Sequence, residues 1–448
     1  MYYIIETQEQ LDKFSQYDLS NCIVDVVPFN DIFHSAISPI SLVYIRPFRS
    51  RAGFILPINH TESFSLTKET ILSLFETRVG QIYAIDSFRL LYFIKDLKSL
   101  NCLKMAKFVA TGELLDEHAY NTPAHNFFYH KYNCKEDINR IIPIAKHYEK
   151  MEKIVQAINM KESWFKPKYY KFLTQIAIPA YHKIESSGIK VDRDILLKHY
   201  NLKCEDASLH EGLIYGSYNP YTATGRPSDA FNGVNFSAQK KDSGSRSSII
   251  PRNSMLIEFD YSSYHVKLLC DLIGYTFEDT DIHTHLGKLY TGKDSLTDEE
   301  YTESKKLTFK FMYTENLPKE IADTIFFKKV REYKHTLWDK YKEKGFIESH
   351  ISKKPIKGID SMTQILPYML QSYETERNVL IIKELHEYLK DKKTKFIMYN
   401  YDSFLFDYAK KDGKKTLEDI QIILEQDGFT VSCNYGSNYQ DMTKLILH

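Results

Sequence analysis

Two aspartates follow strand-like runs, and their carboxylates could bind metal ions. Asp260 ends the apolar run MLIEFD, and Asp402 lies between KFIMYN and FLFDY, two runs that predict a hairpin. If the two strand ends are neighbours, the carboxylates can share a pair of divalent cations. Two such ions roughly 4 Å apart stabilise both the attacking and the leaving oxygen of a phosphoryl transfer. The alternative is that each aspartate only forms a turn, a common role of this residue type.

A predicted helix carries groups that could bind a triphosphate. Thr297 and Glu300 form a capping box, which indicates that the helix starts there and continues through YTESKKLTFKFMY. Four of its residues recur at every fourth position and share one face: Tyr301, Lys305, Phe309 and Tyr313. A lysine among aromatic rings can bind phosphates while the rings stack on bases. The alternative is that Phe309 packs in the core while Lys305 stays in solvent.

The composition indicates a protein with several domains. The chain has 448 residues, of which 43% are hydrophobic, and this length exceeds that of one ordinary core. Its 59 basic and 59 acidic residues balance, so net charge neither indicates nor excludes nucleic acid as a partner. No signal sequence and no membrane-spanning apolar stretch is evident, so we expect no membrane partner. Six scattered cysteines without a CxxC pair favour structural thiols and a reducing, cytoplasmic location.

The order of the predicted elements divides the chain into two halves. Strand-like runs such as CIVDVV and GFILPI alternate with helix-like runs such as ETILSLFE over residues 2–101, which predicts an α/β domain. A helical stretch from Lys166 ends at Gly188, and we place the boundary between the halves near Lys161. The second half contains the strand-and-turn units of the two aspartates, separated by a long helical region.

Several segments resemble the motifs of family A (Klenow-type) DNA polymerases, in the same order along the chain. They are TATGRPS at 222–228 (TxTGRLS in the family), DYSSYHVK at 260–267 (motif A), DIHT at 281–284, KxxxFxxxY from Lys305 (motif B), GFIESHISKK at 345–354 (GYVETLxGRR), Gln371 with Glu376 (QGTAAD) and YDS at 401–403 (HDE, motif C). The resemblance covers most of the chain after Lys166 and implies a DNA-directed DNA polymerase. Such an enzyme extends a primer on template DNA with deoxynucleoside triphosphates and uses two Mg²⁺ ions, here held by Asp260 and Asp402.

The resemblance also implies the fold and the roles of further residues. We expect an α/β and α+β multidomain chain: an RNase H-like exonuclease-type domain at 1–160, connecting helices and a reduced thumb at 161–221, and a right-hand polymerase palm and fingers at 222–448, with the fingers at about 276–345. Lys305 would bind the triphosphate and donate a proton to the departing pyrophosphate, and Tyr313 would check the nascent base pair. The residues implied to bind the nucleotide are Lys305, Phe309, Tyr313, His265 and Tyr261, and those implied to bind DNA are Arg226, Arg246, Gln371 and Tyr401. For Arg226 and Arg246 the alternative is an exposed loop arginine.

Some positions depart from the family pattern. His265 replaces the glutamate that excludes ribonucleotides by occupying the 2′-hydroxyl position, although an imidazole keeps bulk and a donor or acceptor. Tyr301 stands where the family has a phosphate-binding arginine, so triphosphate affinity is lower or Lys306 or Lys310 compensates. These departures leave two alternatives open: a catalytically silent polymerase-like protein that binds nucleic acid, or a polymerase with relaxed sugar selectivity.

The first half resembles the family's 3′-5′ exonuclease domain in layout. That nuclease chemistry requires four carboxylates around two metal ions, beginning with Asp-x-Glu on the first strand. Here the strand reads Asp25, Val26, Val27, and the later strand end expected to read HN reads Ile85, Asp86. We therefore predict a structural domain without nuclease activity, in which Asp25 and Asp86 hold at most a weak ion.

The segment that leads into the polymerase half is short. Only residues 198–221 separate IESSGIKVDRDIL from TATGR, which is far shorter than a full helical thumb. We expect a weak grip on duplex DNA, and hence low processivity or dependence on a processivity partner or an oligomer. A compact enzyme of this kind suits a phage and would act in the host cytoplasm.

Overall fold

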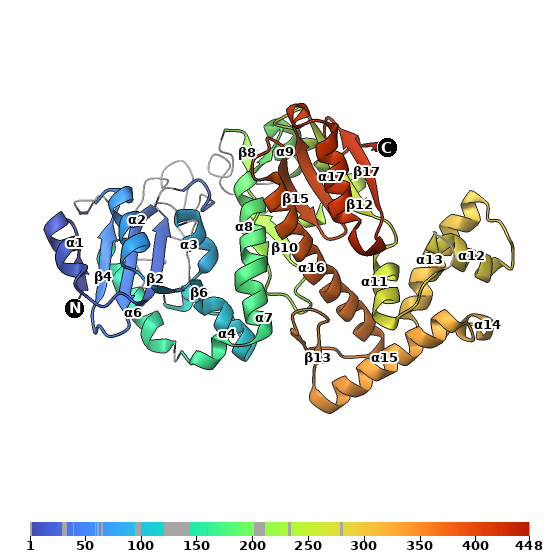
Figure 1. The fold of residues 1–448 in the computed structure, drawn as a ribbon, viewed down its shortest axis with the longest axis horizontal. Helices are drawn as coiled ribbons and strands as arrows, with labels where there is room; N and C mark the ends of the chain where they lie inside the picture. The colour runs from blue at the N-terminus through green and yellow to red at the C-terminus, as the bar shows by residue number, and fades with distance from the viewer. Residues whose placement is uncertain are drawn as a thin grey trace.

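The computed structural model describes residues 2–447 except 29–33, 39, 59, 61, 64–65, 95–99, 121–142, 159, 201–210, 232–233 and 278–280. Figure 1 shows an N-terminal α/β unit at the left, a second α/β unit in the middle, and helices that extend from it to the right. None of the helices in these described segments has the length and apolar character needed to cross a bilayer. The four described cysteines are free and buried: Cys22, Cys102, Cys270 and Cys433.

A six-stranded sheet forms the centre of the N-terminal unit. Its strands are β1 (Tyr2–Ile4), β2 (Asn21–Pro28), β3 (Ile40–Pro47), β4 (Gly53–Pro57), β5 (Gln81–Ala84) and β6 (Leu100–Cys102), in the order β1-β4-β3-β2-β5-β6. Its helices are α1 (Gln8–Phe14), α2 (Lys68–Thr77), α3 (Ser87–Phe93), α4 (Leu103–Thr111) and α6 (Ile144–Ala157). Strands β2, β3 and β4 are antiparallel neighbours, whereas β5 and β6 continue the sheet in parallel from β2. Both faces are covered, because alternate residues of β3 enter two separate apolar clusters.

A nearly continuous helix connects this unit to the rest of the chain. It consists of α7 (Lys168–Phe172), a π-helical turn (Leu173–Ala177) and α8 (Ile178–Ser187). It ends at Gly188, whose φ of +63° lies in the left-handed region that favours glycine, so the predicted stop is confirmed. Short elements follow: β7 (Ile189–Lys190), α9 (Arg193–His199), β8 (Leu213–Ile214), β9 (Tyr218–Asn219), β10 (Ser228–Phe231) and β11 (Val234–Asn235). Part of the predicted reduced thumb, residues 201–210, lies outside the described residues, so that expectation remains a prediction.

A buried carboxyl group joins the N-terminal unit to α8. Glu185 accepts hydrogen bonds from the hydroxyl group of Tyr92 on α3 and, at 2.6 Å, from the backbone N–H of Tyr218. Burial raises the pKa of Glu185 to about 8, and the negative charge of Asp229 acts in the same direction. The folded protein therefore holds this carboxyl group in its protonated form at neutral pH.

Replacing Glu185 with glutamine is expected to reduce the dependence of stability on pH. Between pH 4.5, the ordinary pKa, and about 8, the folded protein keeps a proton on Glu185 that the unfolded chain has lost. The free energy of unfolding of the wild type therefore falls as pH rises through this window, by up to about 1.4 kcal/mol per pH unit from this group. A glutamine amide does not titrate, so urea unfolding at pH 5, 6.5 and 8 should show the variant gaining stability relative to the wild type. A difference that stays constant with pH would contradict this account.

The second sheet is antiparallel and forms the centre of the C-terminal half. Its strands are β12 (Met255–Tyr261), β15 (Lys395–Asn400), β16 (Ser403–Tyr408), β17 (Val431–Gly436) and β18 (Thr443–Leu445), in the order β15-β16-β12-β17-β18. The sheet packs with α8, α11 (Tyr264–Ile273), α16 (Met362–Leu389) and α17 (Lys414–Leu424) in one large apolar core. The strand that carries Asp260 is thus the middle strand, paired on one side with β16 and on the other with β17.

Helices between β12 and β15 form the extension on the right of Figure 1. They are α12 (Ile282–Thr291), α13 (Asp298–Tyr313), α14 (Lys319–Ala322) and α15 (Ile325–Lys344), followed by the hairpin of β13 (Ile347–Glu348) and β14 (Pro355–Ile356). The predicted capping box is present, with Glu300 N–H donating to the Thr297 hydroxyl oxygen at 3.2 Å. Helix α16 then runs back toward the sheet and carries polar residues past the end of β12. The domain limits near residues 160 and 221, and at about 276–345, remain predictions.

Candidate active site

The two aspartates predicted to bind metal lie next to each other at one end of the C-terminal sheet. Asp260 is paired across the sheet with Ser403, and the backbone N–H of Tyr261 donates to the carbonyl oxygen of Asp402 at 2.9 Å. Tyr401 and Asp402 form the turn between β15 and β16, and Tyr401 has a φ of +62°, in the left-handed region. The antiparallel register therefore brings together two carboxylates that are far apart in the sequence.

The electrostatics of this strand end disfavour two bare carboxylates. Burial raises the pKa of Asp260 to about 7, and the negative charges of Asp402 and Glu258 act in the same direction. Partial loss of solvent also raises the pKa of Asp402, with the negative charge of Glu374 as the next cause. A bound cation would remove this penalty, because it favours the charged form of both groups.

The face of α13 that the sequence predicts to bind the nucleotide is the exposed side of that helix. Phe309 is 39% exposed, so the alternative that it packs in the core is wrong. Lys305 is exposed, with its Nζ atom 4.6 Å from the centre of the Tyr301 ring. The buried side of α13 consists of other positions, namely Ser304, Thr308, Phe311 and Met312. Among the described residues Lys305 forms no ion pair, so its charge is available to an anionic ligand.

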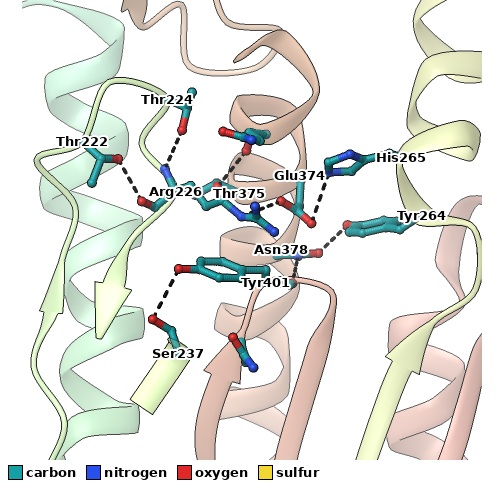
Figure 2. A network of polar contacts seen from close by, with 12 residues as sticks. Thr222, Thr224, Arg226, Ser237, Tyr264, His265, Glu374, Thr375, Asn378 and Tyr401 are labelled. Atoms are coloured by element: carbon teal, nitrogen blue, oxygen red, sulfur yellow. Dashed lines mark hydrogen bonds and ion pairs between the residues drawn. The ribbon is translucent and has the colours of Figure 1, made fainter. Parts of the chain in front are cut away.

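Arg226 lies over the turn that carries Asp402. Gly225, at a φ of +80°, provides the sharp turn before it, and the Arg226 guanidinium carbon lies 3.7 Å from the centre of the Tyr401 ring. Its Nε atom is 3.1 Å from Oε2 of Glu374, as Figure 2 shows. The Arg226 side chain is only 27% exposed, so the alternative of an exposed loop arginine is wrong for this residue.

His265 lies on α11, just after β12, and its side chain contacts α13. Its Nδ1 atom is 3.0 Å from the hydroxyl oxygen of Tyr313, and its Nε2 atom is 3.6 Å from Oε1 of Glu374. Figure 2 shows the imidazole facing Glu374 from the side opposite to Arg226. The structure thus brings Arg226, His265, Tyr313 and Tyr401 together, next to Asp402.

The expected contact between the Tyr261 side chain and the nucleotide needs correction. Successive side chains of a strand point to opposite faces, so Tyr261 shares a face with Ile257 and Phe259 and is 4% exposed in the main core. Its hydroxyl group donates to the carbonyl oxygen of Leu424 at 2.7 Å, and its ring stacks on Tyr264. The Tyr261 side chain therefore supports the sheet from behind, whereas Asp260 points to the other face.

Two further predicted DNA contacts lie in less open positions. Arg246 is 9% exposed, which rules out the alternative of an exposed loop arginine. Its Nε–H donates to the carbonyl oxygen of Gln239 at 3.0 Å, and its guanidinium carbon lies 4.6 Å from the centre of the Tyr439 ring. Gln371 is half-buried on α16, one turn before Glu374. Roles for Arg246 and Gln371 in DNA binding remain predictions.

Two further residues near these groups have no role implied by the sequence. Glu374 is buried on α16 between Arg226 and His265, and no local pattern in QSYETER marks it. His283 on α12 lies with its ring 6.2 Å from Phe309 and 6.3 Å from Tyr301. Burial lowers the pKa of His283, and the nearby charge of Lys305 acts in the same direction. The match of DIHT to the family segment was the available signal for His283.

The carboxylates fit a magnesium site that substrate completes. No group of three or more His, Cys, Asp or Glu side chains within the described residues is arranged to hold a metal ion. Mg²⁺ does not require one, because proteins often bind it through one or two carboxylates while waters and substrate phosphates supply the other ligands. Asp260 and Asp402 meet that requirement because they lie next to each other. A bound cation would offset the burial that raises their pKa values.

The chain has the fold of a DNA polymerase domain. It superposes on the POL domain of Pol1 from M. smegmatis, solved in complex with DNA primer-template and dNTP, with a TM-score of 0.73 over 98% of this chain and 99% of that chain. The two sequences are 12% identical, so this similarity establishes the fold alone. No protein-family model matches the chain, and no curated protein sequence matches it significantly.

Proposed function

We propose that this chain is a DNA-directed DNA polymerase of the family A type. The observation that carries the proposal is the register of β12 and β16, which sets Asp260 beside Asp402 at an accessible sheet end in a chain with a polymerase-domain fold. The M. smegmatis protein was solved with primer-template DNA and dNTP, and we extend these ligands to this chain. In this chain, the C-terminal sheet would form the palm and helices α12–α15 the fingers.

The proposed reaction joins a deoxynucleotide to the 3′ end of a primer. Two Mg²⁺ ions held by Asp260 and Asp402 would, when bound, stabilise the charge that develops on the transferring phosphoryl group. Lys305 would bind the triphosphate and give a proton to the departing pyrophosphate, since its ammonium group is exposed and unpaired among the described residues. The exposed ring of Phe309 would stack on the incoming base, with Tyr313 next to it on the same face of α13.

Arg226 and Tyr401 would contact the end of the primer. The guanidinium carbon lies 3.7 Å from the centre of the Tyr401 ring, next to Asp402, which gives a fixed donor where the primer terminus has to be held. Tyr401 is itself anchored, since Nδ2 of Asn378 donates to its carbonyl oxygen at 2.7 Å and its hydroxyl group lies 3.3 Å from Oγ of Ser237.

Primer extension with purified protein and Mg²⁺ tests the proposal against its rivals. A polymerase adds nucleotides to an annealed primer, whereas a silent nucleic-acid binding protein retains DNA and adds none. Equal rates with deoxy- and ribonucleotides would indicate relaxed sugar selectivity, and His265 would then be the residue to examine. We expect addition of deoxynucleotides, and binding of the same DNA without any addition would contradict the proposal.

We also propose that the N-terminal unit has no nuclease activity. Its strand order is compatible with the RNase H-like arrangement, and the pairing of its carboxylates supports the proposal. One Nη atom of Arg89 lies 2.9 Å from Asp25 and 2.9 Å from Glu117, and Lys104 lies 3.0 Å from Asp86. Positive side chains of the protein therefore neutralise the carboxylates that a divalent ion would need.

The wild type is accordingly expected to release no nucleotides from the 3′ end of single-stranded DNA. Asp25 is 4% exposed and paired with Arg89, so it is not available to a metal ion. The measurement is digestion of an end-labelled oligonucleotide with Mg²⁺ or Mn²⁺, with the Asp25→Ala variant as control. Release by the wild type that the Asp25→Ala variant lacks would overturn this prediction.

A further inference from the structure

Glu374 is a buried acid in the middle of the candidate active site. Its side chain is 1% exposed, and it begins a run of five buried polar residues on α16, at positions 374–378. A buried carboxylate is costly unless positive groups or hydrogen bonds compensate its charge. Oε2 faces Arg226 at 3.1 Å, and Oε1 faces His265 at 3.6 Å. Each oxygen therefore serves a different partner, from a different segment of the chain (Figure 2).

Through its contact with His265, Glu374 can affect α13, one of the proposed fingers helices. A carboxylate next to Nε2 favours the imidazole form that has its proton on that nitrogen. Nδ1 then keeps a free electron pair and can accept the Tyr313 hydroxyl group, which lies 3.0 Å away. The imidazole of His265 thus lies between Glu374 and Tyr313, the last residue of α13.

Glu374 also contacts Arg226, the residue proposed to bind the end of the primer. The Nε atom of Arg226 and Oε2 of Glu374 are close, yet neither has an aligned hydrogen bond, so the attraction is one of charge. This attraction holds the guanidinium group over the ring of Tyr401, the residue before Asp402. One carboxylate therefore fixes groups on both sides of the strand end that carries the aspartates.

We propose that Glu374 is a positioning residue for the reaction, aligning Tyr313 through His265 and holding Arg226 against Tyr401. This inference rests on the proposed polymerase function. It explains why a charged residue occupies a buried position on α16, and why His265 can replace an acidic residue in motif A. Here the carboxylate comes from α16 and lies 3.6 Å from the imidazole that stands at the motif A position.

Single-nucleotide incorporation by the full chain tests the inference with Glu374→Gln. We expect kcat/KM for the correct deoxynucleotide to fall about tenfold, the usual size of a lost hydrogen bond or ion pair to a charged group. Glu374→Asp, which keeps the charge but withdraws it by one methylene group, should show an intermediate loss. The matched control is Glu384→Gln on the same helix, where the exposed carboxylate contacts only Gln426 among the described residues, and wild-type kinetics are expected.

A second comparison separates positioning from simple structural support. In a His265→Ala background, Glu374→Gln should leave the nucleotide KM unchanged, because the path to Tyr313 is already broken, and should still weaken binding of the primer end through Arg226. Wild-type kinetics in Glu374→Gln would overturn the inference while leaving the polymerase proposal intact. An equal further rise of the nucleotide KM in both backgrounds would also overturn it. No extension by the wild type would instead contradict the polymerase proposal and the inference together.

Discussion

Replacing Asp402 with alanine is expected to lower the rate of nucleotide addition by about 10³-fold or more. The substitution removes one of the two carboxylates proposed to hold Mg²⁺ and leaves a single carboxylate for two ions. It also removes a negative charge next to the proposed DNA path, so affinity for primer-template DNA should stay equal or increase. Single-turnover incorporation, together with a separate measurement of DNA affinity, distinguishes a catalytic defect from a binding defect.

The control for this experiment is Asp391→Ala. Asp391 is an exposed aspartate just after α16 and away from the end of β12, and the variant should behave like the wild type. Normal incorporation by Asp402→Ala, or an equal loss in the two variants, would remove Asp402 from the reaction.

The Lys305→Ala variant is expected to lose about 10²-fold in kcat/KM for the nucleotide. The substitution removes the charge proposed to bind the triphosphate and the proton proposed for the departing pyrophosphate. Lys305 shares the open face of α13 with Phe309 and Tyr313, which places its ammonium group next to the proposed base-binding rings. The rate and the nucleotide KM should therefore both change, while affinity for DNA without nucleotide stays near that of the wild type.

Two neighbouring lysines show whether the effect is specific to Lys305. Lys306 and Lys310 are exposed on the same helix, and each lies about 100° around the axis from the residue that precedes it, Lys305 or Phe309. Lys306 lies 3.4 Å from Glu303. A moderate rise of the nucleotide KM in Lys306→Ala or Lys310→Ala would identify the residue that compensates for Tyr301 at the family's arginine position. A larger loss in either of these variants than in Lys305→Ala would contradict the assignment.

Elements with strong local signals could be predicted from the sequence. The capping box at Thr297 predicted the start of α13, and the apolar runs beside the two aspartates predicted β12 and the β15-β16 hairpin. Gly188 marked the end of α8 because only a residue tolerant of positive φ ends a helix in that way. How these elements pair could not be read from such local signals, because register depends on contacts between distant segments.

The candidate site shows the same division between local and distant information. Asp260 ends a strand and Asp402 lies in a hairpin turn, so the residues next to them in the sequence predict where each one lies. Glu374 contacts Arg226 and His265 from a helix that is distant in the sequence, so its neighbours do not predict these contacts. In a helix of 28 residues with several acidic side chains, the sequence alone predicts that any one of them lies on the solvent-exposed face. For Tyr261, strand alternation predicts the core position that its side chain occupies, whereas the resemblance to motif A implied a contact with the nucleotide.

The most direct measurement is the location of bound ions in crystals of the full chain with primer-template DNA, an unreactive deoxynucleotide and Mn²⁺. Anomalous scattering from Mn²⁺ would show the ions without reference to the protein model. The account predicts two ions between the nucleotide phosphates and the carboxylates of Asp260 and Asp402. Ions bound elsewhere, or a nucleotide bound with neither carboxylate near its phosphates, would contradict it.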